Sequence, residues 1–228
     1  PAAISDRPRE EQPGAREARQ QVALVVGDGG ELLFGVGVVV GAGRIGKGWG
    51  GAAFSGHYEI TGRITGEARL RGKVFKVDCV DTLDRSWGPR KERDNSNATW
   101  IHGSFGERLT VHAFLALDPA RTNDFGALIS GYVLDDGRVY GLVGARGTAE
   151  RQGIFPMSNA LEVTDTRGKT FSFTGATINA APWAPFPSMI YTQAYQRWNH
   201  EGKIGYGVQQ DVLARSYLTR NRGAIAQI

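Results

Sequence analysis

Cysteine is nearly absent from this 228-residue chain. Cys79 is the single thiol, so no disulfide can close within one chain. The stretch V-F-K-V-D-C-V alternates as a strand does, which predicts that this thiol is buried among apolar neighbours. The sequence also lacks the run of about 18 apolar residues that a membrane-spanning helix needs. It shows no charged-then-apolar leader with a cleavage site, so we expect a cytoplasmic protein without a membrane span.

Charge of one sign is not concentrated anywhere. The chain has 27 basic and 23 acidic residues, for a formal net charge of +4, and no five basic residues are consecutive. This distribution argues against a nucleic-acid groove. The four histidines lack close ligand spacing, and no Gly-x-Ser-x-Gly sequence is present. We therefore expect no metal site, no serine hydrolase and no bound cofactor.

Two phosphate-binding patterns are present but lack their usual context. Gly41, Gly43 and Gly46 match G-x-G-x-x-G, and the same stretch nearly matches a phosphate loop ending at Lys47. Gly48 occupies the position of the magnesium-binding hydroxyl, and the glycine-rich sequence that follows does not favour a helix. The interpretation is a low-complexity segment or flexible arm. Residues 1–53, charged and then glycine-rich, are predicted to be poorly ordered or atypical.

Residues 54–228 are predicted to form a single β-rich region. Short stretches that alternate between apolar and polar residues recur there, separated by turns that carry glycine, and no convincing helix interrupts them. This pattern predicts an all-β antiparallel sandwich or barrel. The expected hairpins cover residues 57–78 with a turn at Arg71-Gly72, 98–117 with a turn at Gly106-Glu107, 128–144 with an Asp-Gly turn, 161–179, and 190–213.

Aromatic and histidine side chains interrupt the aliphatic positions of these strands. A lipocalin-type barrel with an aromatic-lined cavity has this pattern, and so does an ordinary half-buried sheet surface. The residues concerned are Trp100, His102, His112, Tyr132, Tyr191, Tyr195 and Trp198.

The most distinctive stretch is D-T-L-D-R-S-W-G-P-R, residues 81–90. It resembles the D-H-S-W-G-x-R signature of a family of bacterial proteins of unassigned function. That family is similar to the lipocalin-like superfamily of carotenoid 1,2-hydratase (hydroxyneurosporene synthase), kievitone hydratase and the fungal decalin-forming cyclases. The paired strands before the stretch, W-I-H-G-S-F after it and R-W-N-H-E-G-K-I-G-Y-G-V near the end extend the resemblance over residues 54–228.

The resemblance implies a fold and a chemistry. Members of the superfamily contain two lipocalin-like β-domains in tandem, so a chain of this length implies an incomplete tandem. Their substrates are apolar polyenes that an aspartic acid protonates. Asp84 would then be the proton donor, Trp87 the cavity wall beside a carbocation, Arg90 the orienting group, and His102 or His112 an auxiliary.

Two positions depart from the family pattern. Arg85 stands where the family has histidine, which puts a proton shuttle there in doubt. Q-Q-D follows G-Y-G-V in place of an expected glutamate, which weakens an acid role at that end of the chain.

Each of these residues also has a purely structural interpretation. Trp87 with Arg90 packed across its ring would close one end of a barrel. Asp84 could pair with Arg85 or Arg90, which would lower its pKa and prevent an acid role. The proline-rich stretch Ala181–Tyr191 could be a lid over a cavity or a crossover that tucks its aromatic side chains into the core.

The functional expectation is a protein that binds a hydrophobic small molecule, such as a terpenoid, steroid or aromatic, in a barrel cavity. If it is an enzyme, the reaction is a cofactor-free hydration, isomerisation or cyclisation. The alternatives are a non-catalytic lipophile-binding module and a truncated, inactive relative whose open sheet edges require a partner chain, for instance in a homo-oligomer. The expected ligand contacts are Trp87, Arg90, Trp100, Tyr132, Trp183, Tyr191 and Trp198.

Overall fold

The computed structural model describes residues 20–26, 30–42, 56–87 and 97–226, which form twelve strands and one helix. No helix in these ranges is long and apolar enough to cross a membrane. In chain order the elements are β1 Gln20–Val26, β2 Gly30–Ala42, β3 Gly56–Leu70, β4 Lys73–Trp87, β5 Ala98–Ser104, β6 Leu109–Ala116, β7 Leu128–Asp135, β8 Arg138–Gln152, β9 Phe155–Asp165, β10 Thr170–Phe186, β11 Met189–His200, β12 Lys203–Ala214 and α1 Arg215–Ile225.

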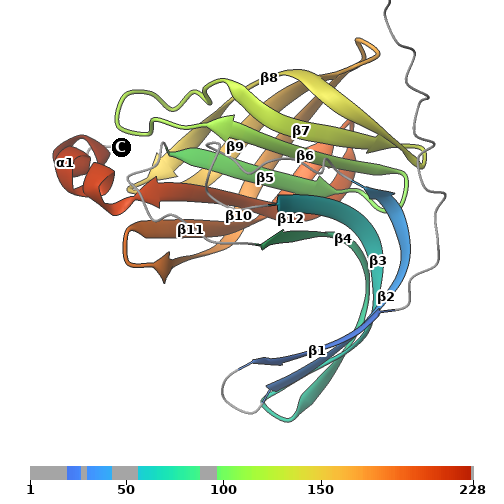
Figure 1. Ribbon diagram of the computed structural model, residues 1–228. Coiled ribbons are helices and arrows are strands. Elements are labelled where there is room, and N and C mark those ends of the chain that lie inside the picture. The colour runs from blue at the N-terminus through green and yellow to red at the C-terminus, as the bar shows by residue number, and fades with distance from the viewer. Residues whose placement is uncertain (1–19, 27–29, 43–55, 88–96, 227–228) are drawn as a thin grey trace, which may run out of the picture.

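Strands β5 to β12 form a closed antiparallel barrel in the order β10-β11-β12-β5-β6-β7-β8-β9 (Figure 1). Tight turns connect several of its hairpins, and their residues have the positive φ angles that such turns require. Asp136 and Gly137 have φ angles of 52° and 78°, and Glu201 and Gly202 have φ angles of 50° and 82°. The predicted all-β antiparallel fold is confirmed, and so are the turns between these strands.

Strands β1 to β4 form a separate four-stranded antiparallel sheet that curves away from the barrel (Figure 1). The predicted turn at Arg71-Gly72 joins β3 to β4, with φ angles of 50° and 74°. Strands β1 and β2 lie within residues 1–53, and β2 pairs with β3 across the predicted division at residue 54. Most of the phosphate-binding patterns, from Gly43 onward, lie outside the described residues. The division into two segments stays a prediction.

Alternation along the barrel strands separates an inner from an outer face. Ile101, Val111 and Val133 are fully buried members of the core inside the barrel. Their neighbours in the chain, among them His102, His112 and Tyr132, therefore project from the outer face. The prediction that these residues line a cavity inside the barrel is wrong, because they point away from the interior. The apolar part of the interior is a packed core that includes Leu115, Leu161, Val163, Phe171, Phe173, Trp198 and Leu213.

Two further predictions about local structure are wrong. Residues 215–225 form the helix α1, which the sequence did not indicate. The proline-rich stretch is neither a lid nor a crossover loop, since β10 continues through it to Phe186 and pairs with β11. Strand β9 pairs with β10 only from Thr170 to Ala176. The prolines of β10 lie beyond this range. Their lack of a backbone N–H therefore removes no hydrogen bond to β9.

Cys79 was predicted to be buried but is exposed on β4. The apolar residues Leu70, Val74 and Phe75 near the same hairpin turn are also about half exposed. The strand pattern was therefore correct, but it did not reveal that the end of this hairpin extends beyond the barrel (Figure 1).

The packed interior predicts a large stability difference between two positions on β10. Phe173 is 1% exposed and Ile178 is 61% exposed. We expect Phe173→Ala to lower the free energy of unfolding by about 3–5 kcal/mol, because it leaves a cavity. We expect Ile178→Ala to change it by less than about 1 kcal/mol. Urea unfolding followed by tryptophan fluorescence measures both, and equal losses would contradict a packed interior.

Candidate functional site

The outer face of β5, β6 and β7 carries a cluster of polar and aromatic side chains that β3 and β4 cover. We call this cluster the junction site. It consists of Glu59, Thr61, Asp81, Thr82, Trp100, His102, His112 and Tyr132. Strand pairing accounts for its barrel side, because His102 lies opposite His112 and His112 lies opposite Tyr132. Residues that are opposite on adjacent strands point to the same face.

Glu59 is the centre of the junction site. Glu59 as a whole is only 7% exposed, so its carboxylate is largely removed from water. The indole Nε1–H of Trp100 donates a 2.5 Å hydrogen bond to Oε1 of Glu59. Oε2 of Glu59 lies 2.7 Å from Nδ1 of His112. This distance is that of an ion pair, but the two groups are not aligned as in a hydrogen bond. A buried carboxylate thus contacts one fixed donor and one titratable ring.

His102 occupies the position next to this pair. Its Nδ1 lies 3.3 Å from Oδ1 of Asp81, whose side chain is 54% exposed. Burial, with a smaller contribution from His112, lowers the pKa of His102 to about 3, while the charge of Glu59 acts in the opposite direction. The imidazole is therefore neutral near pH 7. Partial burial also raises the pKa of Asp81.

Tyr132 completes the site on β7. Its hydroxyl lies 2.9 Å from the hydroxyl of Thr61, which lies 3.4 Å from that of Thr82. Burial raises the pKa of Tyr132 to about 12, so the phenol stays protonated. The rings of Tyr132 and Trp100 each have their centroid 5.3 Å from that of His112. His112 is therefore held between two aromatic rings.

Two buried ring nitrogens remain available in this cluster. Nε2 of His102 and Nε2 of His112 have no hydrogen-bond partner among the described residues. A buried polar atom without a partner costs about 1–3 kcal/mol, so such atoms indicate a site for a ligand or water. Together with Glu59 they can hold, donate and accept a proton. No group of three His, Cys, Asp or Glu side chains within the described ranges could hold a metal ion.

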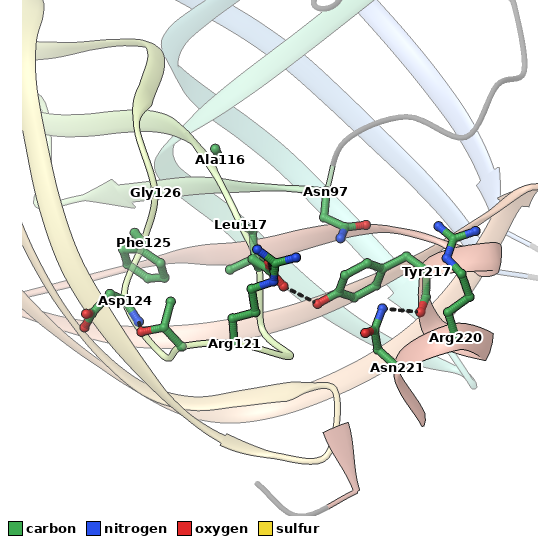
Figure 2. Close-up of a pocket in the computed structure, with 12 residues that line it drawn as sticks. Asn97, Ala116, Leu117, Arg121, Asp124, Phe125, Gly126, Tyr217, Arg220 and Asn221 are labelled. Atoms are coloured by element: carbon green, nitrogen blue, oxygen red, sulfur yellow. Dashed lines mark hydrogen bonds and ion pairs between the residues drawn. The ribbon is translucent and has the colours of Figure 1, made fainter. Parts of the chain in front are cut away.

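A separate pocket of about 610 Å³ lies at the end of the barrel beside α1 (Figure 2). Leu117 and Phe125 belong to the barrel core and form its apolar part. On the α1 side, the hydroxyl of Tyr217 donates a 2.7 Å hydrogen bond to Asp118. Burial and this carboxylate raise the pKa of Tyr217 to about 12. None of the residues predicted as ligand contacts lines this pocket.

Four of the predicted site residues meet in the junction site, namely Trp100, His102, His112 and Tyr132. Trp198 lies apart from them, fully buried inside the barrel. Trp183 and Tyr191 are not part of the cluster. The rings of those two residues pack edge to face near the end of the β10–β11 hairpin, with centroids 5.1 Å apart.

The predicted catalytic acid is not in a dry environment. Asp84 is exposed on β4, directly opposite Glu59 in the strand register, so the expected desolvation of its carboxyl is wrong. Trp87 ends β4, but its side chain lies outside what the structure describes, as does Arg90. Glu59, Thr61 and Asp81 were not predicted as site residues. Glu59 alternates with the apolar residues Tyr58 and Ile60 in H-Y-E-I-T, so the pattern gave it a polar position and no signal of its burial.

The pKa of His102 predicts a pH-dependent stability. An unfolded histidine titrates near pH 6.5, so the unfolded chain binds a proton below that pH while folded His102 binds none until about pH 3. Stability therefore falls as the pH falls through this window. Between pH 6.5 and 4.5, we expect the free energy of unfolding to fall by about 2 kcal/mol less in His102→Gln than in the wild type. Urea unfolding at both values measures it, and an identical loss in the variant would contradict a neutral buried ring.

Comparison with known proteins gives a family and a fold. The family described as Domain of unknown function (DUF7064) matches residues 37–210. The crystal structure of an AttH candidate from Nitrosomonas europaea is similar, with a TM-score of 0.56 and 12% identity. The similarity covers 85% of this chain and 64% of that protein, so the chain spans less than two thirds of its length. No curated protein matches the chain. The chain belongs to the family of domains of unknown function DUF7064, and its fold is all-β and lipocalin-like.

Proposed function

We propose that the protein binds a hydrophobic, alkene-bearing small molecule at the junction site and catalyses a cofactor-free proton transfer to it. The reaction would be a hydration, isomerisation or cyclisation. The observation that carries this proposal is the buried carboxylate of Glu59, fixed by Trp100 and in contact with His112. Glu59 takes the acid role that the sequence motif predicts for Asp84.

The electrostatics of the site favour an acid–base role. Glu59 and His112 are both largely buried, and their closest atoms are 2.7 Å apart. A carboxyl group and an imidazole this close can pass a proton between them, which suits a group that gives and regains a proton. The neutral His102 beside this pair adds a hydrogen-bonding ring without adding a charge.

The steps balance for a hydration. The Glu59–His112 pair delivers one proton to an alkene carbon, which leaves a carbocation on the neighbouring carbon. The face of the Trp100 ring stabilises this cation electrostatically. A water molecule adds its oxygen to the cation and returns one proton to the pair, so that alkene and water become an alcohol. For isomerisation, the proton returns from a ligand carbon and no water is added.

Two resemblances support an apolar ligand, and the first of them also supports this class of reaction. The D-T-L-D-R-S-W-G-P-R stretch resembles the signature of the lipocalin-like proteins related to carotenoid 1,2-hydratase, whose substrates are apolar polyenes. The lipocalin-like fold is one that encloses apolar ligands in other proteins. In this chain the apolar part of the barrel interior is packed, so the proposal places the ligand at the junction site.

A non-catalytic binding module is the second candidate. The same contacts attach β3 and β4 to the barrel, and an exposed ion pair between Arg63 and Glu107 adds to them at 3.2 Å. On this alternative, the junction site binds the lipophile and Glu59 holds the two sheets together.

Deuterium incorporation into model alkenes tests the proposal. The purified protein is incubated with farnesol or with retinol in deuterated water, and the products are analysed by mass spectrometry. We expect wild-type protein to add deuterium to carbon, with or without addition of water. We expect Glu59→Gln to lower the rate about 100-fold or more, because the amide cannot donate an acidic proton. The amide oxygen can still accept the Trp100 hydrogen bond.

Asp84→Asn is the matched control, since Asp84 lies opposite Glu59 in the register and is exposed. We expect it to retain the wild-type rate. Native mass spectrometry and thermal melting establish that each variant binds the probe and folds. Binding without deuterium incorporation by the wild type would favour the non-catalytic module. Loss of the rate in Asp84→Asn with retention in Glu59→Gln would contradict the assignment of the acid.

A further inference from the structure

The barrel interior contains a second polar group of residues that the junction site does not use. We call it the interior polar layer: Thr99, Arg151, Asn159, Thr192, Gln196, Gln209 and Asp211. Every one of these residues is buried. Alternation places them on the inner face, because Leu213 follows Asp211 by two residues and belongs to the barrel core. The layer lies at the end of the barrel that α1 follows.

Arg151 and Asp211 form the charged pair of this layer. Nη1 of Arg151 donates a 2.6 Å hydrogen bond to Oδ2 of Asp211, and both side chains are 0% exposed. The other carboxylate oxygen accepts a 3.1 Å hydrogen bond from Nε2 of Gln209. Both oxygens of Asp211 therefore have donors, and its charge is neutralised by Arg151.

The guanidinium, by contrast, has an unused edge. Its Nη1 contacts Asp211 and, more weakly, the carbonyl of Ile154 at 3.4 Å. Nε and Nη2 have no hydrogen-bond partner among the described residues, although they are fully buried. The Nε–Nη2 edge is a planar pair of donors that matches the two oxygens of a carboxylate. A buried edge of this kind requires an acceptor.

The other unpartnered atoms around the pair are compatible with the same ligand. Thr99 and Thr192 lie directly opposite Asp211 on the strands on either side of β12, and neither hydroxyl has a partner within the described part of the chain. Hydroxyls can donate to a carboxylate. Most of the unpartnered atoms of the layer can therefore donate a hydrogen bond to a ligand. Among its described residues, Oδ1 of Asn159 is the one unpartnered atom that can only accept.

We propose that the interior polar layer binds the carboxylate of an organic acid, held by the Nε–Nη2 edge of Arg151. The pocket beside α1 would hold the rest of this ligand. Asn97 lines that pocket and precedes Thr99 by two residues, which is about 7 Å along a strand. Leu117 and Phe125 offer an apolar surface there, so the ligand is a carboxylic acid with an apolar chain or ring. This site is separate from the junction site and does not depend on its chemistry.

A fluorescent fatty acid tests the site directly. The probe is 11-(dansylamino)undecanoic acid, with its methyl ester as the matched ligand that lacks the carboxylate. We expect the wild-type protein to bind the acid roughly 10-fold or more tightly than the ester, as the loss of a charge-assisted bidentate contact requires. Equal affinity for the two probes would overturn the proposal, as would the absence of binding.

A variant that removed only Arg151 or only Asp211 would leave the other charge buried without a partner. The double substitution Arg151→Met with Asp211→Leu replaces the pair by apolar side chains of similar size, which proteins tolerate better than loss of one partner. We expect this variant to melt cooperatively and to lose the preference for the acid. Arg146→Met is the control, because Arg146 is an 81% exposed arginine of the same strand. A preference that survives the double substitution, or that disappears in the control, would contradict the assignment to Arg151.

Discussion

A carboxylate that leaves water must find donors or counter-charges, and in this protein that requirement falls on Glu59. Among the described contacts between the β3–β4 hairpin and the barrel, the exposed ones, such as Arg63 with Glu107, contribute little because solvent screens them. The buried contacts of Glu59 with Trp100 and His112 are different, since breaking them leaves a charge without compensation. The position of the open sheet against the barrel therefore depends strongly on Glu59, next to which the buried hydrogen bond between Thr61 and Tyr132 joins the same two sheets.

The barrel divides its interior between two kinds of packing. One part is a packed core in which Phe173 and Trp198 are almost completely buried. The other part is a hydrogen-bonded layer around the pair of Arg151 and Asp211, in which Asn159 donates to both Gln196 and Gln209 at 2.7 Å. An apolar core of the same volume would fold at lower cost in desolvation. This cost is consistent with the proposal that the interior polar layer recognises a ligand.

Sequence patterns predicted the strands of the barrel and their turns, because alternation and Asp-Gly or Glu-Gly turns depend on local geometry. They also selected His102 and His112, which lie opposite each other in the register. They could not tell the inner from the outer face, because both faces of β5 and β6 are buried, one by the core and one by the hairpin. The exposure of Asp84 and the burial of Glu59 depend on how two sheets meet, and such contacts between distant segments leave no periodic signal.

Strand β5 serves both polar sites at once. Thr99 and Ile101 face the interior, and Trp100 and His102 face the hairpin. Since successive side chains point to opposite faces, a slip of one residue would exchange the two sets completely. An insertion or deletion of a single residue in this strand would destroy both surfaces together, whereas point substitutions can alter one and spare the other. Divergence of either site during evolution is therefore expected to proceed by replacement at fixed length along β5.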